Sequence, residues 1–319
     1  MRQLEKNKMF NKIKAKFNYL PGLKKNSFLI VFGFFILIIF IFRGSIAYNF
    51  SRVVKKIKNE QPEVVIVYKD EVTVKILEGW TNADIDKQLK DNFFLTWGDD
   101  EFLQAIGTRR VDNLSETQEF NFDWASEFSF LASKPDNLSL EGYLFPDTYR
   151  FFASSTPLEV TQRMLLNFEK KITKEMMLEI KKQGKTLHEI ITMASIIEKE
   201  APIFNQSNSD DAKLISGIFW KRQEIGMALQ SDATLSYIYE NKKPAHSEEE
   251  LKVKSPYNTY LYLGLPPGPI CNPGLIAIEA AIYPQESDYL YFLTPLDGSQ
   301  VYYAKSYQEH LNNKYKYLK

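Results

Sequence analysis

Two glutamates near the end of an apolar run are the first residues whose types and spacing could do chemistry. The stretch MASIIEKEAP, residues 193–202, carries Glu198 and Glu200. At about 100° per residue from Leu187, Glu198 falls about 20° away, at the centre of the apolar stripe, whereas Glu200 falls at about 220°. A carboxylate among apolar side chains loses hydration when charged, so its pKa rises. Glu198 is therefore predicted to be a general acid, with Glu200 as the reserve candidate.

A purely structural role for Glu198 remains open at this point. Pro202 ends the helix just after Ala201, so the Glu198 side chain could extend past the edge of the core or pair with an arginine. The sequence pattern alone does not decide between these two interpretations.

Other reactive side chains are few. Cys271 is the single cysteine, which excludes a disulfide within the chain and indicates an inert packing residue. His188, His246 and His310 lie far apart in the sequence with no partner at metal-ligand spacing. We expect no metal and no cofactor.

The elements that must position the acid form an α+β pattern. Strand composition occurs at 64–68 and 72–77, and two short helices are predicted to follow, one from Thr81 or Asn82 and one from Asp99 to Gly107. Further helices are predicted at 157–183, from Thr186, and at 209–226, then a proline-rich and glycine-rich loop at 264–274. A hairpin at Asp297-Gly298 and a helix capped by Ser306 end the pattern.

The N-terminal segment predicts a membrane anchor. Residues 1–25 hold eight Lys or Arg against one acid, although the whole chain is neutral. The remaining residues therefore carry a net charge of −7, which excludes a typical nucleic-acid binder. Residues 28–42 form an unbroken uncharged run of 15 residues. A helix this long approaches the thickness of a bilayer core, and the basic flank predicts a cytosolic N-terminus. A cleaved signal peptide is the alternative.

Four motifs in order resemble one protein family. They are LEGYLFPDTYRF (140–151), MASIIEKEA (193–201), ISGIFWKRQEIGMALQSDATLSYI (215–238) and SPYNTYLYLGLPPGPICNPGLIAIEAAIYP (255–284). Together they resemble the endolytic murein transglycosylases, the YceG-like family, over roughly residues 70–319. The segment 64–110 is similar to the LysM-like subdomain of that family.

The resemblance implies a domain plan and an activity. The plan is a cytoplasmic segment (1–25), a transmembrane helix (26–43), a linker (44–63), a LysM-like subdomain with its connector (64–135) and a mixed α/β catalytic domain (136–319) on the outer side of a bacterial cytoplasmic membrane. The activity is cleavage of the β-1,4 bond between N-acetylmuramic acid and N-acetylglucosamine in peptidoglycan, which leaves 1,6-anhydromuramic acid ends. The catalytic glutamate of the E-K-E motif is matched to Glu198.

The resemblance also implies a set of substrate-binding residues along the glycan cleft. They are Glu141, Tyr143, Gln230, Ser231, Asp232, Tyr257, Asn258 and Thr259. Asp232 could instead cap the helix that follows it, and Glu141 could serve the scaffold.

Two rival functions remain. The chain could be a non-catalytic, membrane-anchored glycan-binding scaffold for wall synthases, or a hydrolase that uses Glu198, Asp232 and a water molecule. The expected partners are peptidoglycan strands, the membrane, and penicillin-binding synthases or other elongation and division proteins.

Overall fold

The computed structural model divides the chain into two units, Met1–Val67 and Tyr68–Lys319. It describes residues 70–93, 97–109, 111, 114, 122–201, 209–241, 243, 245–295 and 300–318. The predicted strand at 64–68 and the predicted anchor at 28–42 lie outside these residues. No helix among the described residues is long and apolar enough to cross a membrane.

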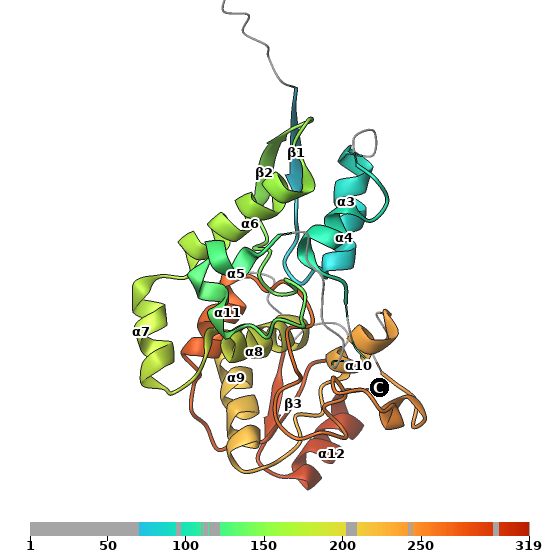
Figure 1. The fold of residues 1–319 in the computed structure, drawn as a ribbon. Helices are drawn as coiled ribbons and strands as arrows, with labels where there is room; N and C mark the ends of the chain where they lie inside the picture. Colours follow the sequence, from blue (N-terminus) through green and yellow to red (C-terminus); the bar gives the residue numbers. More distant parts are fainter. Residues whose placement is uncertain are drawn as a thin grey trace, which may run out of the picture. The chain divides into compact units, whose positions relative to one another are not determined.

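The described part of the second unit is mostly helical, with two small antiparallel sheets (Figure 1). The strands are β1 (Glu71–Lys75), β2 (Thr148–Phe152), β3 (Tyr291–Leu293) and β4 (Tyr302–Ala304). The helices are α3 (Asn82–Phe93), α4 (Glu101–Ile106), α5 (Trp124–Glu127), η1 (Ser129–Ser133), α6 (Pro157–Lys171), α7 (Lys174–Lys182), α8 (Leu187–Glu200), α9 (Ser209–Glu224), α10 (Asp232–Tyr239), η3 (Glu250–Lys252), α11 (Leu275–Ile282) and α12 (Tyr307–Tyr317).

The mixed α and β content agrees with the predicted fold class, and most predicted elements are confirmed. The α8 helix begins at a capping box in which Thr186 and Glu189 bond each other's backbone N–H, and Ser306 and Glu309 do the same for α12. The α8 helix ends at Glu200, as Pro202 predicts. The predicted hairpin is β3–β4, although its turn lies outside the described residues.

The predicted helical section over 157–183 is present, and it is divided into two helices, α6 and α7. Between them, Ile172 and Thr173 adopt extended backbone, and the Thr173 hydroxyl accepts the N–H of Met176 to start a new helix. A threonine at this position competes for backbone hydrogen bonds that a continuous helix would use.

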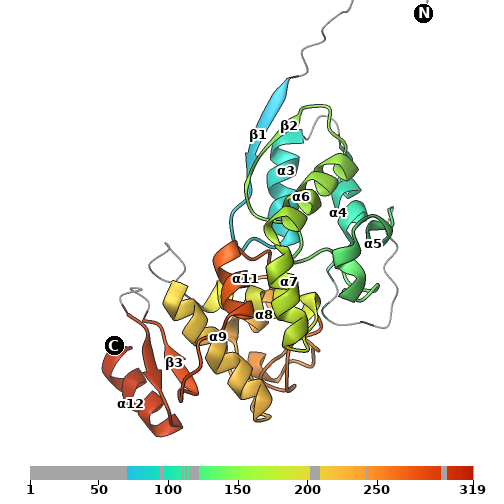
Figure 2. The ribbon, with the colours of Figure 1, turned by 90° about the vertical axis from the view of Figure 1, so that its left-hand side faces the viewer.

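The sheet β1–β2 joins the two segments that the sequence assigns to different domains. Val72 pairs with Phe151 and Val74 with Tyr149, so a strand from the segment predicted to be LysM-like is bonded to one from the segment predicted to be catalytic. In Figures 1 and 2 this sheet, α3 and α6 lie at one end of the unit, and β3 and α12 lie at the other.

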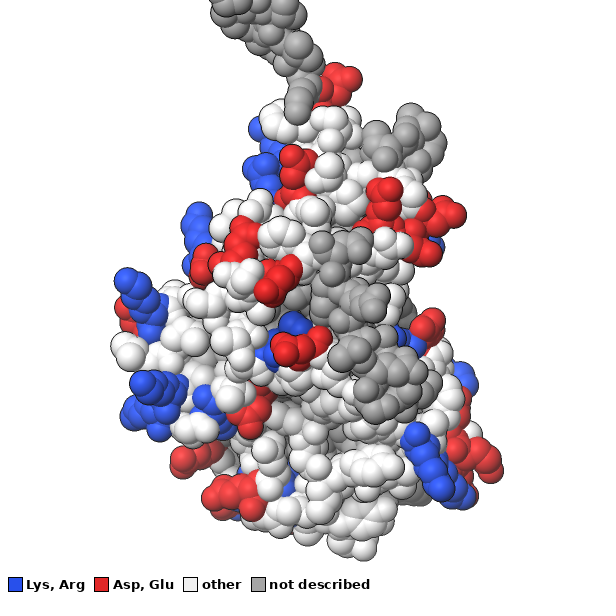
Figure 3. Space-filling model, in the orientation of Figure 1, with Lys and Arg blue, Asp and Glu red and all other residues white. Residues whose placement is uncertain are grey.

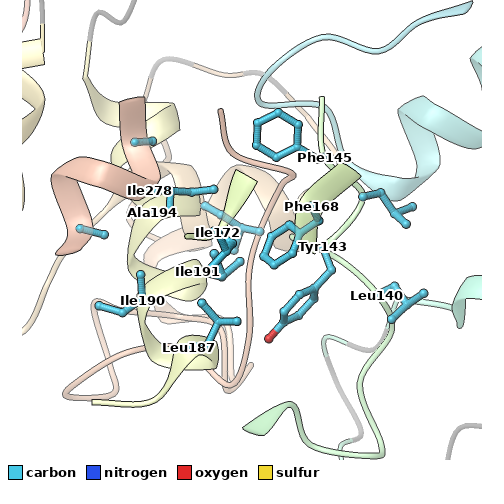
Figure 4. Close-up of a cluster of buried hydrophobic side chains, with 14 of the residues drawn as sticks. Leu140, Tyr143, Phe145, Phe168, Ile172, Leu187, Ile190, Ile191, Ala194 and Ile278 are labelled. Carbon is cyan, nitrogen blue, oxygen red and sulfur yellow. The ribbon is translucent and has the colours of Figure 1, made fainter. Parts of the chain in front are cut away.

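The α8 helix forms the centre of the core. It packs against α11, α9 and α10, and its residues from Leu187 to Ile197 are buried apart from Glu189. Figure 4 shows Leu187 and Ile191 of α8 on the side of the helix that faces Tyr143 and Phe168, with Ile190 on the other side. The side chains of Tyr143 and Phe168 are fully buried. Because the helix is covered on several sides, Glu198 and Glu200 near its end are partly buried, whereas Lys199 between them is exposed.

A buried asparagine joins three distant segments beside α8. The Asn272 Oδ1 accepts the N–H groups of Gly142 and Leu144 at 3.0 and 2.9 Å. Its Nδ2 donates to the Trp80 carbonyl and the Asn82 side chain at 3.1 and 3.0 Å. The loop 264–274, the segment 140–144 and the start of α3 are thereby held together.

Gly142 is the residue at which this arrangement leaves no room for a side chain. Its φ is +90°, and a Cβ would lie 2.6 Å from Pro269 and 2.8 Å from Ile191. Gly184 also has positive φ, at +69°, but nothing lies within 4 Å of its Cβ position.

We therefore predict different costs for the same substitution at these two glycines. Gly184→Ala should lower the free energy of unfolding by about 1 kcal/mol, the cost of left-handed backbone. Gly142→Ala adds overpacking against Pro269 and should lower the free energy of unfolding by about 2–5 kcal/mol in total. Urea unfolding of the purified full chain measures both, and equal costs would contradict the close packing at Gly142.

Candidate active site

A large groove crosses the second unit, with a volume of about 2030 Å³. Its wall includes α3 residues, the segment 107–109, the end of α8, the start of α10, and residues of β3 and α12. Small-molecule sites usually hold about 300–1,000 Å³, so this groove is large enough for part of a polymer. Among the predicted site residues, Glu141, Gln230 and Asp232 line it, and so does Glu200.

Glu200 enters the groove at the last residue of α8. The Ser231 hydroxyl donates to its Oε1 at 2.5 Å. Burial raises the pKa of Glu200, and the negative charge of Asp232 raises it further. The Ser231 hydroxyl, the Ala233 N–H and the positive charge of Arg222 oppose the rise. The net effect is a carboxyl group that retains a proton to higher pH than an exposed glutamate.

Asp232 and Tyr260 stand beside Glu200. The Tyr260 hydroxyl donates to Asp232 Oδ1 at 2.8 Å, and both side chains line the groove. Ser231, not Asp232, is the N-cap of α10, and its side chain makes no capping bond. The predicted alternative that Asp232 caps the helix is therefore wrong. Tyr260 is a groove residue that the sequence analysis missed, although it directly follows the YNT triplet.

Gln230 adopts left-handed backbone with φ of +52°, which is uncommon for a residue with a side chain. Its N–H donates to the Thr259 carbonyl, and the next N–H, of Ser231, donates to the Thr259 hydroxyl. These two bonds hold the turn that leads into α10 and leave the Gln230 side chain exposed in the groove wall.

Glu198 lies at a different place from Glu200. Its Oε2 accepts the N–H of Gly274, the N-cap of α11, at 3.0 Å. Burial raises the pKa of Glu198 to about 7, and the charge of Glu78 also raises it, whereas the Gly274 N–H and Lys199 lower it. The predicted rise in the pKa of Glu198 is therefore present, but Glu198 is not among the described residues that form the groove wall.

Glu141 is a buried carboxyl group at the edge of the groove. Its Oε1 accepts the Asn82 N–H at 2.9 Å and the Asn272 side chain at 3.3 Å. Burial raises its pKa to about 8, against the lowering effects of the Asn82 N–H and the charge of Arg109. The Arg109 guanidinium lies 4.8 Å from the centre of the Tyr237 ring, beside the same cluster.

Five predicted binding residues lie behind the groove wall: Ser231, which bonds Glu200, and the four that follow. Tyr257, Asn258 and Thr259 are buried, and the Asn258 amide donates to the carbonyls of Leu251 and Val253. Tyr143 is a fully buried ring whose hydroxyl bonds His188 Nδ1 at 3.0 Å. These side chains support the loops that carry groove residues and do not themselves line the groove.

Cys271 is fully buried, and its thiol donates to the Ser195 carbonyl at 3.3 Å. Burial raises the pKa of this thiol far above its usual value, which removes the thiolate needed for nucleophilic attack. The described residues contain no group of three His, Cys, Asp or Glu side chains suited to hold a metal ion.

Comparison with known proteins gives one consistent result. The model of the YceG-like family matches residues 42–316. An endolytic murein transglycosylase of Bacillus subtilis is 38% identical over 179 residues, which are 56% of this chain and 48% of that protein. One of Streptococcus pneumoniae is 36% identical over 179 residues, 54% of this chain and 31% of that protein. The matched region spans about half or less of these relatives.

A solved structure extends the match to the fold. The crystal structure of a yceG-like protein from Listeria monocytogenes aligns with a TM-score of 0.62 and 31% identity. The alignment covers 75% of this chain and 75% of that chain.

The buried Glu141 predicts a pH-dependent stability. Because its folded pKa of about 8 lies above the ordinary 4.5, the folded state holds a proton that the unfolded state releases, so stability falls as pH rises from about 4.5 to about 8. Glu141→Gln should remove part of this fall, whereas Glu169→Gln on the exposed face of α6 should not. Urea midpoints of the full chain at pH 5 to 9 give the slopes, and a Glu141→Gln slope equal to that of the unchanged chain would refute the role.

Proposed function

The chain belongs to the YceG-like family, and from that membership we propose that it is an endolytic murein transglycosylase acting on peptidoglycan strands. The named relatives support the activity, and the groove supports a polymeric substrate. The observation that carries the proposal is the carboxyl group of Glu200, which has a raised pKa and lies in the groove wall.

We propose Glu200, rather than Glu198, as the general acid. Both pKa values are raised by burial, so the pKa alone does not choose between them. A general acid must reach the glycosidic oxygen, and only Glu200 of the two lines the groove among the described residues. Glu198 instead bonds the backbone at the start of α11, where it can position the end of α8.

The proposed reaction is proton transfer with an intramolecular nucleophile. Protonated Glu200 donates to the oxygen of the β-1,4 bond, and the bond from that oxygen to C1 of the muramoyl sugar breaks. The C6 hydroxyl oxygen of the same sugar closes on C1, and its proton passes to the Glu200 carboxylate. The acid is restored, the new end is a 1,6-anhydro sugar, and no second carboxylate is required, unlike the paired acids of most glycoside hydrolases.

The residues around Glu200 have distinct roles in this scheme. The Ser231 hydroxyl and the Ala233 N–H hold the Glu200 carboxyl in place, and we propose that this carboxyl carries the transferred proton. Asp232 raises the pKa of Glu200 and is itself oriented by Tyr260. We propose that the exposed amide of Gln230 bonds substrate hydroxyl or N-acetyl groups.

A hydrolase is the second candidate, because a second carboxylate, Asp232, stands next to Glu200. In that case Asp232 would activate a water molecule and the products would carry reducing ends. The end group of the product separates the two reactions.

We also propose the membrane setting that the sequence suggests. The uncharged run at 28–42 behind a basic segment supports a single-pass anchor with the remaining chain outside the cytosol. Wall synthases of the penicillin-binding class are the proposed partners. The strand β1 and the helices α3 and α4 support the proposal of a LysM-like module, with either a glycan-binding or a purely structural role.

The two glutamates give the first test of function. Glu200→Gln should lower kcat on uncrosslinked peptidoglycan strands by about 10²- to 10⁴-fold, because the proton donor is lost. Glu198→Gln keeps an oxygen that can accept the Gly274 N–H and should lower kcat by less than about tenfold. Mass spectrometry of the products of the full chain in detergent counts new 1,6-anhydro ends.

Other outcomes of this experiment have defined meanings. Loss of activity only in Glu198→Gln would return the acid role to that residue. Reducing ends from the unchanged chain would establish the hydrolase, and bound but uncut strands would favour a scaffold.

Asp232 predicts a shift in the pH profile. Because its charge raises the pKa of Glu200, Asp232→Asn should lower that pKa. Activity that needs protonated Glu200 falls as pH rises through the pKa, so the fall should move to lower pH in the variant. The Asn side chain still offers an oxygen to Tyr260. Initial rates from pH 4 to 9 measure the shift, and an unmoved alkaline limb would refute the coupling.

A further inference from the structure

The groove continues well beyond Glu200, to the surface formed by β3 and α12. Tyr291 of β3 and Tyr307, His310 and Tyr317 of α12 all line this far end, which we call the tyrosine end. The proposed acid chemistry uses none of these four residues. An occupant that reaches both parts of the groove must be long.

Arg222 connects Glu200 to the tyrosine end. It is buried, its Nε donates to the Leu290 carbonyl at 2.7 Å, and it lies 5.2 Å from the centre of the Tyr291 ring. Its positive charge also lowers the pKa of Glu200. The tyrosine end therefore begins next to the acid and forms one continuous wall with it.

The rings of the tyrosine end form a partly exposed platform. Tyr291 stacks on His310 with ring centres 5.4 Å apart, and Tyr307 lies 5.9 Å from Tyr291. Tyr307 remains 60% exposed. An exposed aromatic face in a groove can cover the apolar face of a pyranose ring while its hydroxyl stays in water.

Two polar atoms of this wall have no partner in the described structure. The His310 Nδ1 and the Thr294 Oγ1 are buried from solvent and form no hydrogen bond. Both residues line the groove. Burial and the nearby charges of Lys314 and Arg222 lower the pKa of His310. Because both atoms are covered, a ligand in the groove meets the exposed Tyr307 ring rather than these two atoms.

Charge on the same side of the molecule is compatible with an uncharged ligand. The face in Figure 3 is largely white over β3 and α12, with acidic and basic side chains towards its edges. The groove wall at this end also includes Arg222 and Lys314, so the exposed rings, and not an absence of charge, are what favours an uncharged sugar.

We propose that the tyrosine end is a sugar-binding subsite, remote from the bond that is cut, in which the Tyr307 ring stacks on a pyranose ring of the glycan strand. The choice of a glycan as the ligand rests on the proposed function. The tyrosine end binds the strand along the groove, and this binding can be measured separately from the chemistry at Glu200.

The test is binding of the β-1,4-linked N-acetylglucosamine hexamer to the full chain carrying Glu200→Gln, which prevents cleavage. Tyr307→Ala should weaken binding by about three- to tenfold, the usual value of one aromatic stacking contact. Tyr307→Phe should stay within about twofold, because it keeps the ring. Tyr315→Ala is the matched control, since Tyr315 lies on the same helix, is 83% exposed and does not line the groove.

Each outcome decides the proposal. Equal binding by the Tyr307→Ala and Tyr315→Ala chains, or no binding of the hexamer by the parent chain, overturns it. If only Tyr307→Ala weakens hexamer binding, but the chain with Glu200 intact cuts no strand, the subsite is supported and the transglycosylase assignment fails. Unchanged thermal midpoints for Tyr307→Ala and Tyr315→Ala confirm that both variants fold.

Discussion

The buried amide of Asn272 is the interaction on which the site depends. It satisfies backbone N–H groups at Gly142 and Leu144 and bonds the Trp80 carbonyl, and its own backbone bonds the same loop at Gly79 and Trp80. Without the side-chain amide the buried N–H groups of Gly142 and Leu144 would lose this partner, at a cost of about 1–3 kcal/mol apiece. The start of α3, the segment that carries Glu141, and the loop before α11 are fixed relative to one another by one side chain.

The last turn of α8 uses that framework for two different purposes. Glu198 and Glu200 point to the N-terminal ends of α11 and α10, where a backbone N–H meets each carboxylate. Such helix ends favour the charged form, whereas burial favours the protonated one, and burial is the larger effect at both. Burial and helix-end hydrogen bonds therefore act on both carboxyl groups, although Glu200 faces the groove and Glu198 bonds α8 to the start of α11.

The groove extends from this local arrangement to distant elements of the unit. Its length brings the acid, the exposed Gln230 and the rings of β3 and α12 into one wall. The β3–β4 hairpin and α12 come last in the sequence, but Arg222 of α9 anchors them beside the acid through the Leu290 carbonyl and the Tyr291 ring. In the proposed function, chemistry and strand binding would therefore be contributed by elements far apart in the chain.

The sequence by itself determined the local structure. The capping boxes at Thr186 and Ser306, the stop before Pro202 and the burial of Ile85 and Leu89 follow from short-range patterns that operate within one or two turns. The motif order also determined the family, and the apolar surroundings of Glu198 correctly predicted a raised pKa.

Only the tertiary structure decided which carboxyl group faces the groove. The helical projection assumed one buried side, but α8 is covered by α9, α10 and α11, so an apolar position does not identify the side that meets a ligand. For the same reason Tyr257, Asn258 and Thr259 are buried supports while Tyr260 reaches the groove. Which side of a segment stays open depends on what packs against it, and those neighbours are distant in sequence.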